Sequence, residues 1–294
     1  MTIALSPDGR LLTSRSGEVM NLESGDRTQI DIGSPTTRIG QGTFGRINQL
    51  RFSPDGDRLI VAVTNFVGES NPGLIESRVV QFFDLVSGQM MFEFEVDEER
   101  ALRLSFAADG KSFVYCAARK KTSRRDAETG ELIGDYGPAM SSHVVSVDDS
   151  ADGKYVAAVE RDGVVRIWQA ENGKLIHEID VEKTQEPNFN HLACAKFSPD
   201  GRRLAVGGLV GVWILDPKSG EKVVRFRGGR ELSWSHDANR IHCVTSVGVR
   251  EREGDAFDTY PTVEVWDAET GKLIQEFDSS RPQEIVSASL RSLQ

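Results

Sequence analysis

A short turn sequence recurs six times along the 294 residues of the chain, and this repetition limits the folds open to it. Three copies read Ser-Pro-Asp-Gly, and the other three keep aspartate at the third position. The copies begin at Ser6, Ser53, Ala107, Ser150, Ser198 and Ser235. In a type I turn serine accepts a hydrogen bond at the first position, proline presets φ at the second, and glycine closes the turn at the fourth. Each copy therefore predicts a tight turn between two extended segments.

A second turn follows each first turn and ends in glycine, as at residues 266–271. These glycines are Gly25, Gly88, Gly130, Gly173, Gly220 and Gly271. Glycine supplies the positive φ of a hairpin turn with a bulge. Runs rich in β-branched and aromatic residues, such as 155–159 and 164–168, lie between the turns and have the lengths of strands. Each unit is therefore predicted to contain four antiparallel strands.

Four-stranded units at a spacing of about 40–45 residues are the signature of a β-propeller, because one blade buries its faces only against its neighbours. We predict an all-β chain, a single propeller domain over residues 1–294 with six recognisable blades of four antiparallel strands. The blades are expected at residues 1–31, 47–96, 101–137, 144–181, 192–228 and 230–280. Residues 285–290 form an extra strand of a possible seventh blade. That strand either closes a six-bladed ring or belongs to an incomplete seven-bladed one.

These residues resemble the WD-repeat family over nearly the whole chain. The Trp-Asp pair of that family is intact at Trp266-Asp267. Its equivalents in the other units are Met20-Asn21, Phe83-Asp84, Arg125-Asp126, Trp168-Gln169 and Leu215-Asp216. The Gly-His pair of the family is essentially missing, so its hydrogen-bonded tetrad from histidine to tryptophan is not carried over. The resemblance implies a divergent WD-repeat propeller that acts as a non-catalytic scaffold for protein or peptide partners.

The composition limits the classes of partner that the chain is expected to bind and the compartment in which it is expected. A formal net charge of −10 disfavours nucleic acid and acidic membranes as partners. The three cysteines have no paired spacing, so they are interpreted as buried thiols of a reduced compartment rather than as disulfides or zinc ligands. No apolar run is long enough to cross a bilayer, and no secretory leader precedes the first strand. A cytoplasmic protein without cofactor or metal is expected.

The long connections are expected to share one face of the propeller. In WD-repeat propellers the two kinds of tight turn lie on one face, and the remaining connections lie on the opposite, top face. The expected long connections are residues 32–46, 65–78, 183–191 and 247–261. Long loops on a repeat scaffold often carry function, because the rigid sheets tolerate their variation. Neutral insertion is the alternative, but it predicts lengthening on both faces. The top face is therefore the predicted binding face.

Candidate binding residues fall into a basic set and an aromatic set. The position ten residues before the turn glycine holds Arg46, Arg100, His143 and His191 in four successive units. Arginine binds carboxylate and phosphate through paired hydrogen bonds, so this set suits an acidic or phosphorylated peptide. The alternative is partial neutralisation by the acidic residues at 95–99. The aromatic residues expected in the long loops are Phe44, Phe66, Phe189, Phe257 and Tyr260, which either anchor a partner or cover the blades.

Neither of two charged segments, nor the histidine pair, has the pattern of a binding or catalytic motif. The basic run from Arg119 to Arg125 is interpreted as a frayed strand with solvated charges rather than a cationic patch, since no aromatic residues interleave it. The acidic segment 251–258 lacks the regular oxygen spacing of a calcium loop. No nucleophile, phosphate loop or carboxylate shares the register of His143 and His191. The alternatives to a scaffold are a propeller enzyme with a channel-mouth site and the sensory part of a larger protein such as a kinase.

Overall fold

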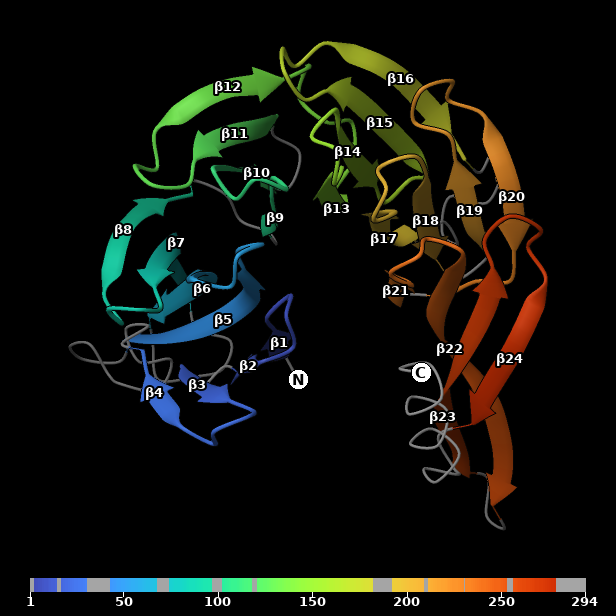
Figure 1. Ribbon diagram of the computed structural model, residues 1–294, viewed down its shortest axis with the longest axis horizontal. Coiled ribbons are helices and arrows are strands. Elements are labelled where there is room, and N and C mark those ends of the chain that lie inside the picture. The colour runs from blue at the N-terminus through green and yellow to red at the C-terminus, as the bar shows by residue number, and fades with distance from the viewer. Residues whose placement is uncertain are drawn as a thin grey trace. The chain divides into compact units, whose positions relative to one another are not determined.

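The chain forms strands and turns throughout the part that the structure describes. A computed structural model describes residues 3–14, 17–30, 43–67, 74–96, 102–117, 121–181, 192–208, 211–229, 231–252 and 256–278 (Figure 1). Within these ranges there are 24 strands, labelled β1 to β24, and no helix. The strands form six antiparallel sheets of four strands each, and within each sheet the strands follow one another in chain order.

The first three sheets lie in the N-terminal half of the chain. The first sheet contains β1 (Ile3–Leu5), β2 (Leu11–Ser14), β3 (Glu18–Asn21) and β4 (Arg27–Gln29). The second contains β5 (Thr43–Phe52), β6 (Arg58–Val67), β7 (Leu74–Asp84) and β8 (Met90–Glu95). The third contains β9 (Leu102–Phe106), β10 (Ser112–Ala117), β11 (Thr122–Asp126) and β12 (Leu132–Tyr136).

The other three sheets repeat this arrangement. The fourth sheet contains β13 (Val144–Asp149), β14 (Tyr155–Glu160), β15 (Val164–Gln169) and β16 (Leu175–Asp180). The fifth contains β17 (Leu192–Phe197), β18 (Leu204–Gly208), β19 (Val212–Leu215) and β20 (Lys222–Phe226). The sixth contains β21 (Glu231–Trp234), β22 (Arg240–Arg252), β23 (Ala256–Asp267) and β24 (Leu273–Asp278). The predicted six four-stranded blades are thus confirmed, whereas residues 285–290 lie outside the described residues.

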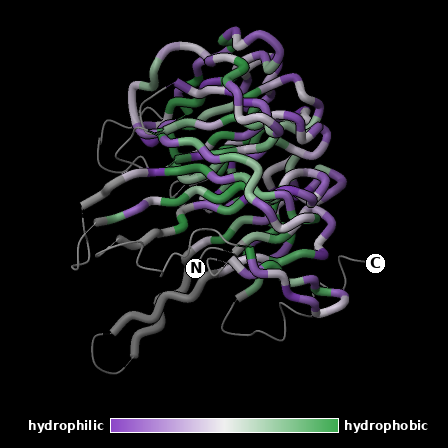
Figure 2. Tube along the Cα trace, turned by 90° about the vertical axis from the view of Figure 1, so that its left-hand side faces the viewer, coloured by the Kyte–Doolittle hydropathy of each residue, from purple (hydrophilic) through white to green (hydrophobic). Residues whose placement is uncertain are grey.

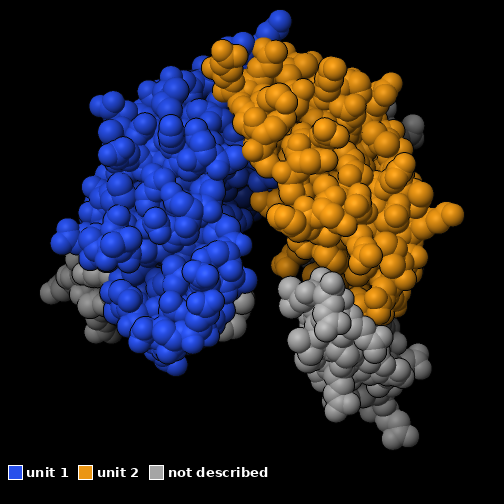
Figure 3. All heavy atoms as spheres, in the orientation of Figure 1, with its two compact units in different colours: residues 1–149, 172–174 blue, residues 150–171, 175–294 orange. Residues whose placement is uncertain are grey.

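Two compact units divide the chain (Figure 3). Unit 1 comprises residues 1–149 and 172–174, which include the first three sheets and β13. Unit 2 comprises residues 150–171 and 175–294, which include β14 to β24. In both, hydrophobic residues run along the strands and hydrophilic residues gather in the turns (Figure 2).

Five of the six turns between the first and second strands are held by a repeated side-chain network. Ser198 donates its hydroxyl hydrogen to Asp200 Oδ1 at 2.5 Å, and Ser198 Oγ accepts the backbone N–H of Arg203 at 3.0 Å. The same serine–aspartate bond forms in the turns that begin at Ser6, Ser53, Ser150 and Ser235. The fourth residue has positive φ, and in the sixth sheet this residue is Ala238 rather than glycine. Alanine pays a steric cost in this conformation that glycine does not.

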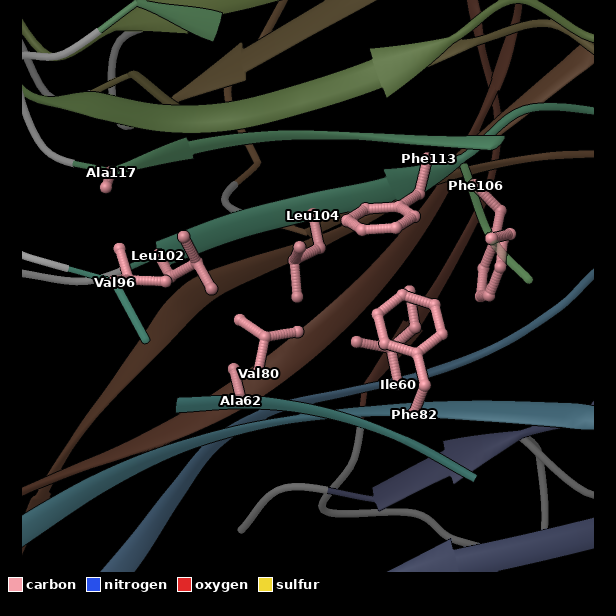
Figure 4. Close-up of a cluster of buried hydrophobic side chains, with 11 residues drawn as sticks. Ile60, Ala62, Val80, Phe82, Val96, Leu102, Leu104, Phe106, Phe113 and Ala117 are labelled. Atoms are coloured by element: carbon pink, nitrogen blue, oxygen red, sulfur yellow. The ribbon is translucent and has the colours of Figure 1, made fainter. Parts of the chain in front are cut away.

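A contact between neighbouring sheets recurs along the chain. It links the third strand of one sheet to the last residue of the first strand in the following sheet. Phe82 of β7 meets Phe106 of β9 with ring centroids 6.1 Å apart, and both belong to one buried cluster with Phe113 (Figure 4). Val19 and Phe52 share a second cluster. Because apolar surface is removed from water on both partners, this contact stabilises neighbouring sheets together.

The turn that begins at Ala107 lacks the serine hydroxyl and provides a matched test of the network. Ser198→Ala should lower the free energy of unfolding by about 1 kcal/mol, because the buried N–H of Arg203 loses its acceptor. Ala107→Ser should raise it by up to about 1 kcal/mol by adding the missing bond to Asp109. Urea unfolding of both variants checks the prediction. Unchanged stability of Ser198→Ala would show that the hydroxyl contributes nothing to the turn.

Candidate functional site

Several strands of the second and sixth sheets are longer than those of the other sheets, and they extend at the same end of the sheet. β5, β6 and β7 contain 10, 10 and 11 residues, and β22 and β23 contain 13 and 12. All other strands contain three to six residues. Consecutive turns of an antiparallel sheet alternate between the two ends of its strands. These extensions therefore lie at the end opposite the serine–aspartate turns. We call this end of the strands the top edge. It comprises residues 43–47, 63–67 and 74–78 in the second sheet, and 246–252 and 256–261 in the sixth.

The extension in the sixth sheet is a two-stranded ribbon. Pairing of β22 with β23 continues from Ser246–Pro261 to Arg252–Ala256. β21 pairs with β22 only as far as Val244, and β24 pairs with β23 only as far as Thr262. Among the described residues no strand flanks the ribbon on either side. At about 3.4 Å per residue, its six or so residues per strand project roughly 20 Å.

Much of the sequence that was expected to form long loops at the top edge forms strands instead. Residues 65–67 and 74–78 belong to β6 and β7, and most of 247–261 belongs to the ribbon. The acidic segment 251–258, expected to be an irregular loop, also lies largely in β22 and β23. Glycine and charged residues interrupt the alternation of these segments in the sequence, yet hairpin pairing satisfies their backbone groups without an apolar pattern. Residues 43–46 likewise begin β5, whereas 31–42 and 182–191 lie outside the described residues.

The predicted binding residues are described only in part. Arg46 and Phe44 lie in β5, opposite Thr64 and Phe66 of β6. Phe257 and Tyr260 lie in β23, so both phenylalanines and the tyrosine belong to strands and not to loops. Phe66 is half-buried in β6, and His143 is half-buried immediately before β13. Arg100, His191 and Phe189 lie outside the described residues. The binding role of the whole set stays a prediction.

A polar surface that the sequence interpretation missed follows the first strands of unit 1. It comprises Gln49 and Arg51 of β5, Arg103 and Ser105 of β9, and Asp148 of β13; we call it the first-strand polar surface. Gln49 Nε2 donates to the carbonyl oxygen of Leu104 at 3.4 Å. Arg103 Nε donates to the carbonyl oxygen of Val145 at 2.6 Å, and Ser105 donates its hydroxyl hydrogen to Asp148 Oδ1 at 3.1 Å. β5 thus reaches β9, and β9 reaches β13, through polar side chains.

A sequence signal for this surface exists in the alternation before each turn. The positions two and four residues before the turn are polar in β5 and β9, and the positions between them are the buried Leu50 and Leu104. Because alternate residues of a strand point to opposite sides, the polar ones form a second surface. In unit 2 the corresponding strands carry Lys196 and Ser233, and the Trp234 indole N–H donates to the carbonyl oxygen of Lys196 at 2.9 Å.

The described part of the chain offers neither a metal site nor a membrane span. No group of three or more His, Cys, Asp or Glu side chains in it is arranged to hold a metal ion. No helix long and apolar enough to cross a bilayer occurs in those ranges.

Comparison with known families identifies the repeat. The family model "WD domain, G-beta repeat" matches residues 133–169, from the outer strand of the third sheet through the third strand of the fourth. The matched segment ends at Trp168-Gln169, the position expected for the Trp-Asp pair. The chain is a WD-repeat β-propeller. The predicted family resemblance is therefore confirmed.

Relatives and solved structures agree with this WD-repeat fold. The chain is 24% identical over 188 residues to a guanine nucleotide-binding protein subunit beta-like protein of Encephalitozoon cuniculi, which covers 62% of this chain and 53% of the relative. It is 33% identical over 107 residues to eukaryotic translation initiation factor 3 subunit I of Phaeosphaeria nodorum, covering 36% and 29% of the two chains. The chain thus spans about half or less of these relatives. A chain in a crystal structure of the mitotic checkpoint complex aligns with a TM-score of 0.65 at 16% identity, covering 94% of this chain and 76% of that one.

The acid of the WD-repeat pair caps the turn between the third and fourth strands. Asp267 Oδ1 accepts the backbone N–H groups of Glu269 and Thr270 at 3.1 and 2.7 Å. The same arrangement forms at Asn21, Asp84, Asp126 and Asp216. These bonds lower the pKa of Asp267 because they stabilise its charged form. Asn21 accepts the equivalent N–H groups of Glu23 and Ser24 through its amide oxygen, so the turn forms without a charge.

Arg125 occupies the position of the WD-repeat tryptophan in the third sheet. Trp266 in the sixth sheet stacks on Phe226, the last residue of β20, with centroids 4.8 Å apart. The Arg125 guanidinium lies over the ring of Phe94, which has the same place in β8, at 4.4 Å. A planar guanidinium stacks on an aromatic face much as an indole does. The interpretation of Arg124 and Arg125 as solvated charges on a frayed strand was wrong, because β11 pairs on both sides.

Between β11 and β13 a buried ion pair of Arg124 with Asp149 takes the place of the apolar recurrent contact. Arg124 Nη2 donates to Asp149 Oδ1 at 2.7 Å, and only 1% of the Asp149 side chain is exposed. Arg124 also donates to the hydroxyl oxygens of Tyr136 and Ser112, at 2.5 and 2.6 Å. Asp149 Oδ2 has no hydrogen-bond partner among the described residues. Burial raises the pKa of Asp149 to about 6, although the Arg124 charge opposes the shift.

The raised pKa of Asp149 predicts a specific pH dependence. Between about pH 4 and 6 the folded chain holds a proton on Asp149 that the unfolded chain has lost. Relative to a carboxyl with the same pKa in both states, Asp149 should therefore add about 2 kcal/mol to the free energy of unfolding as the pH falls from 6 to 4. Asp149→Asn should remove this slope, because the amide carries no titrating proton.

Urea unfolding at several pH values between 4 and 7 measures the slope. Asp135→Asn is the matched control, because Asp135 is an exposed carboxylate of the same unit bonded to Ser123, and this variant should keep the slope. An unaltered slope in Asp149→Asn would assign the pH dependence to another group.

Proposed function

We propose that the chain is a non-catalytic scaffold that binds partner peptides or domains at its top edge. The observation that carries the proposal is the one-sided lengthening of the second and sixth sheets. The strands of these sheets extend only at the top edge, whereas the turns at the opposite edge are short and held by serine, aspartate and asparagine side chains. Variation confined to one edge of a rigid repeat is typical of a binding surface.

The ribbon of β22 and β23 suits partner binding for a further reason. A two-stranded hairpin is only marginally stable in water, and stability usually requires a third strand or a packed face. Its backbone groups beyond Thr245 and Thr262 are free of flanking strands among the described residues. An extended partner segment that pairs with this edge would supply the third strand through main-chain hydrogen bonds.

The family supports the scaffold role in general terms. WD-repeat propellers are generally non-catalytic protein-binding modules, and the similar chain in the mitotic checkpoint complex belongs to an assembly. The predicted contributors Arg46, Arg100, His143 and His191 would add anion-binding groups. We also propose a cytoplasmic location, with which the free thiols Cys116, Cys194 and Cys243 are compatible.

Removing the ribbon tests the proposal. A variant that joins Thr245 to Thr262 through Asn-Gly replaces residues 246–261 with a two-residue hairpin turn, which the Thr245–Thr262 pairing allows. Partners captured from a lysate of the source cells by the full chain should be reduced at least about fivefold with this variant, by quantitative mass spectrometry.

The control changes exposed residues at the opposite edge. Glu128→Ala, Glu171→Ala, Lys218→Ala and Glu269→Ala change exposed turn residues there and should leave capture unchanged. Circular dichroism and urea unfolding establish that both variants are folded. Equal capture by the ribbon variant and the full chain would remove the ribbon from the binding surface, and loss with the control alone would move binding to the opposite edge.

A further inference from the structure

We propose that the first-strand polar surface of unit 1 binds an anionic side chain of a peptide, with Arg51 and Arg103 as the two ligating groups. The inference rests on the proposed scaffold function and names a second place, apart from the ribbon, where a partner would be held. The ligand chemistry is a carboxylate or phosphoryl group that accepts paired hydrogen bonds from guanidinium.

Arg51 and Arg103 come from adjacent first strands. β5 and β9 are neighbours in unit 1, and the Gln49 bond to Leu104 fixes their alignment. Arg51 Nη1 donates to the carbonyl oxygen of Leu50 at 2.9 Å. Arg103 is held at two points, by the carbonyl oxygens of Val145 and Leu102 at 2.6 and 3.2 Å. Both guanidinium groups are therefore oriented by backbone carbonyls, which is the preorganisation that a binding site requires.

Neither arginine has a carboxylate partner among the described residues. Three partly or fully buried arginines of the chain do have one, since Arg58 pairs with Asp55, Arg124 with Asp149, and Arg166 with Glu160 and Glu178. Nη2 of Arg51 and of Arg103 donates no hydrogen bond in the described part of the chain. Two guanidinium groups thus keep free donors for an external acceptor.

The electrostatics of the pair favour an anion. Desolvation by the surrounding protein lowers the pKa of Arg103, and the positive charge of Arg51 lowers it further. Desolvation also lowers the pKa of Arg51, which the negative charge of Asp148 partly offsets. Asp148 already accepts the Ser105 hydroxyl hydrogen. An anion bound to both guanidinium groups would relieve the repulsion that they exert on each other.

The surroundings of the pair favour a peptide over a bare ion. The Gln49 side chain is 8% exposed, and its Oε1 has no hydrogen-bond partner among the described residues. This unused acceptor belongs to the same strand as Arg51, two residues away, which suits a ligand that carries both an anionic group and N–H groups. Arg51 is exposed, so a ligand can reach it from solvent. An acidic or phosphorylated peptide segment combines these features.

Peptide binding to the full chain tests the inference. Two fluorescein-labelled peptides of equal length are compared by fluorescence anisotropy, one with glutamate at alternate positions and one neutral except for a central phosphoserine. At least one should bind, and Arg51→Gln with Arg103→Gln should weaken that binding at least about tenfold. The peptide that binds more tightly identifies the carboxylate or the phosphoryl group as the source of the anion.

Two further variants separate specific contact from bulk charge and from misfolding. Arg10→Gln with Arg27→Gln removes the same charge from ion-paired, exposed positions of unit 1 and should change the dissociation constant less than twofold. Arg51→Lys with Arg103→Lys keeps the charge but not the paired donors, and should weaken binding at least about threefold.

Three results would overturn the inference: no binding of either peptide at millimolar concentration, full binding by the glutamine variant, or equal loss in the Arg10 and Arg27 control. The ribbon-shortened variant should bind the peptide as the full chain does. Failure at the first-strand polar surface is thus distinguishable from failure of the top-edge proposal.

Discussion

The structure depends on contacts between neighbouring sheets that recur at one pair of positions. One member precedes the Trp-Asp position in the third strand, and the other ends the first strand of the following sheet. Phe82 with Phe106 and Val19 with Phe52 are apolar versions, each within a buried cluster. Ile214 and Trp234 share a buried cluster in unit 2 in the same way. A four-stranded sheet alone leaves both faces in water, so this contact is what makes the repeated unit stable.

The contact tolerates a change of chemistry provided that both members change. Arg124 and Asp149 hold the same two positions as Phe82 and Phe106, with Tyr136 and Ser112 accepting two further hydrogen bonds from the guanidinium. The neighbouring Arg125 stacks on Phe94 where Trp266 stacks on Phe226. Further hydrogen bonds offset the cost of burying an ion pair, which explains why the polar side chains cluster at this junction.

Local signals in the sequence were sufficient for the fold, because turn residues and glycines at fixed offsets determine where each strand ends. The Ser198–Asp200 and Asp267–Thr270 bonds are short-range, so the residues that form them stand together in the sequence. The ribbon of β22 and β23 was not predictable, since its pairing satisfies backbone groups without an apolar pattern. Arg51 and Arg103 were missed because each looks like an ordinary charged strand residue until the next strand is placed beside it. The pairing of Arg124 with Asp149 likewise joins different sheets.

A rigid repeat whose sheets support one another can present a long ribbon at one edge and oriented arginines along its first strands without loss of fold. The most direct test of this account is a double-mutant cycle on Phe82→Leu and Phe106→Leu, with the free energy of unfolding measured in urea. The account predicts a coupling energy of about 1 kcal/mol between the two positions, as expected for an aromatic pair in contact. Additive losses, with a coupling energy indistinguishable from zero, would contradict the claim that this pair of positions joins one sheet to the next.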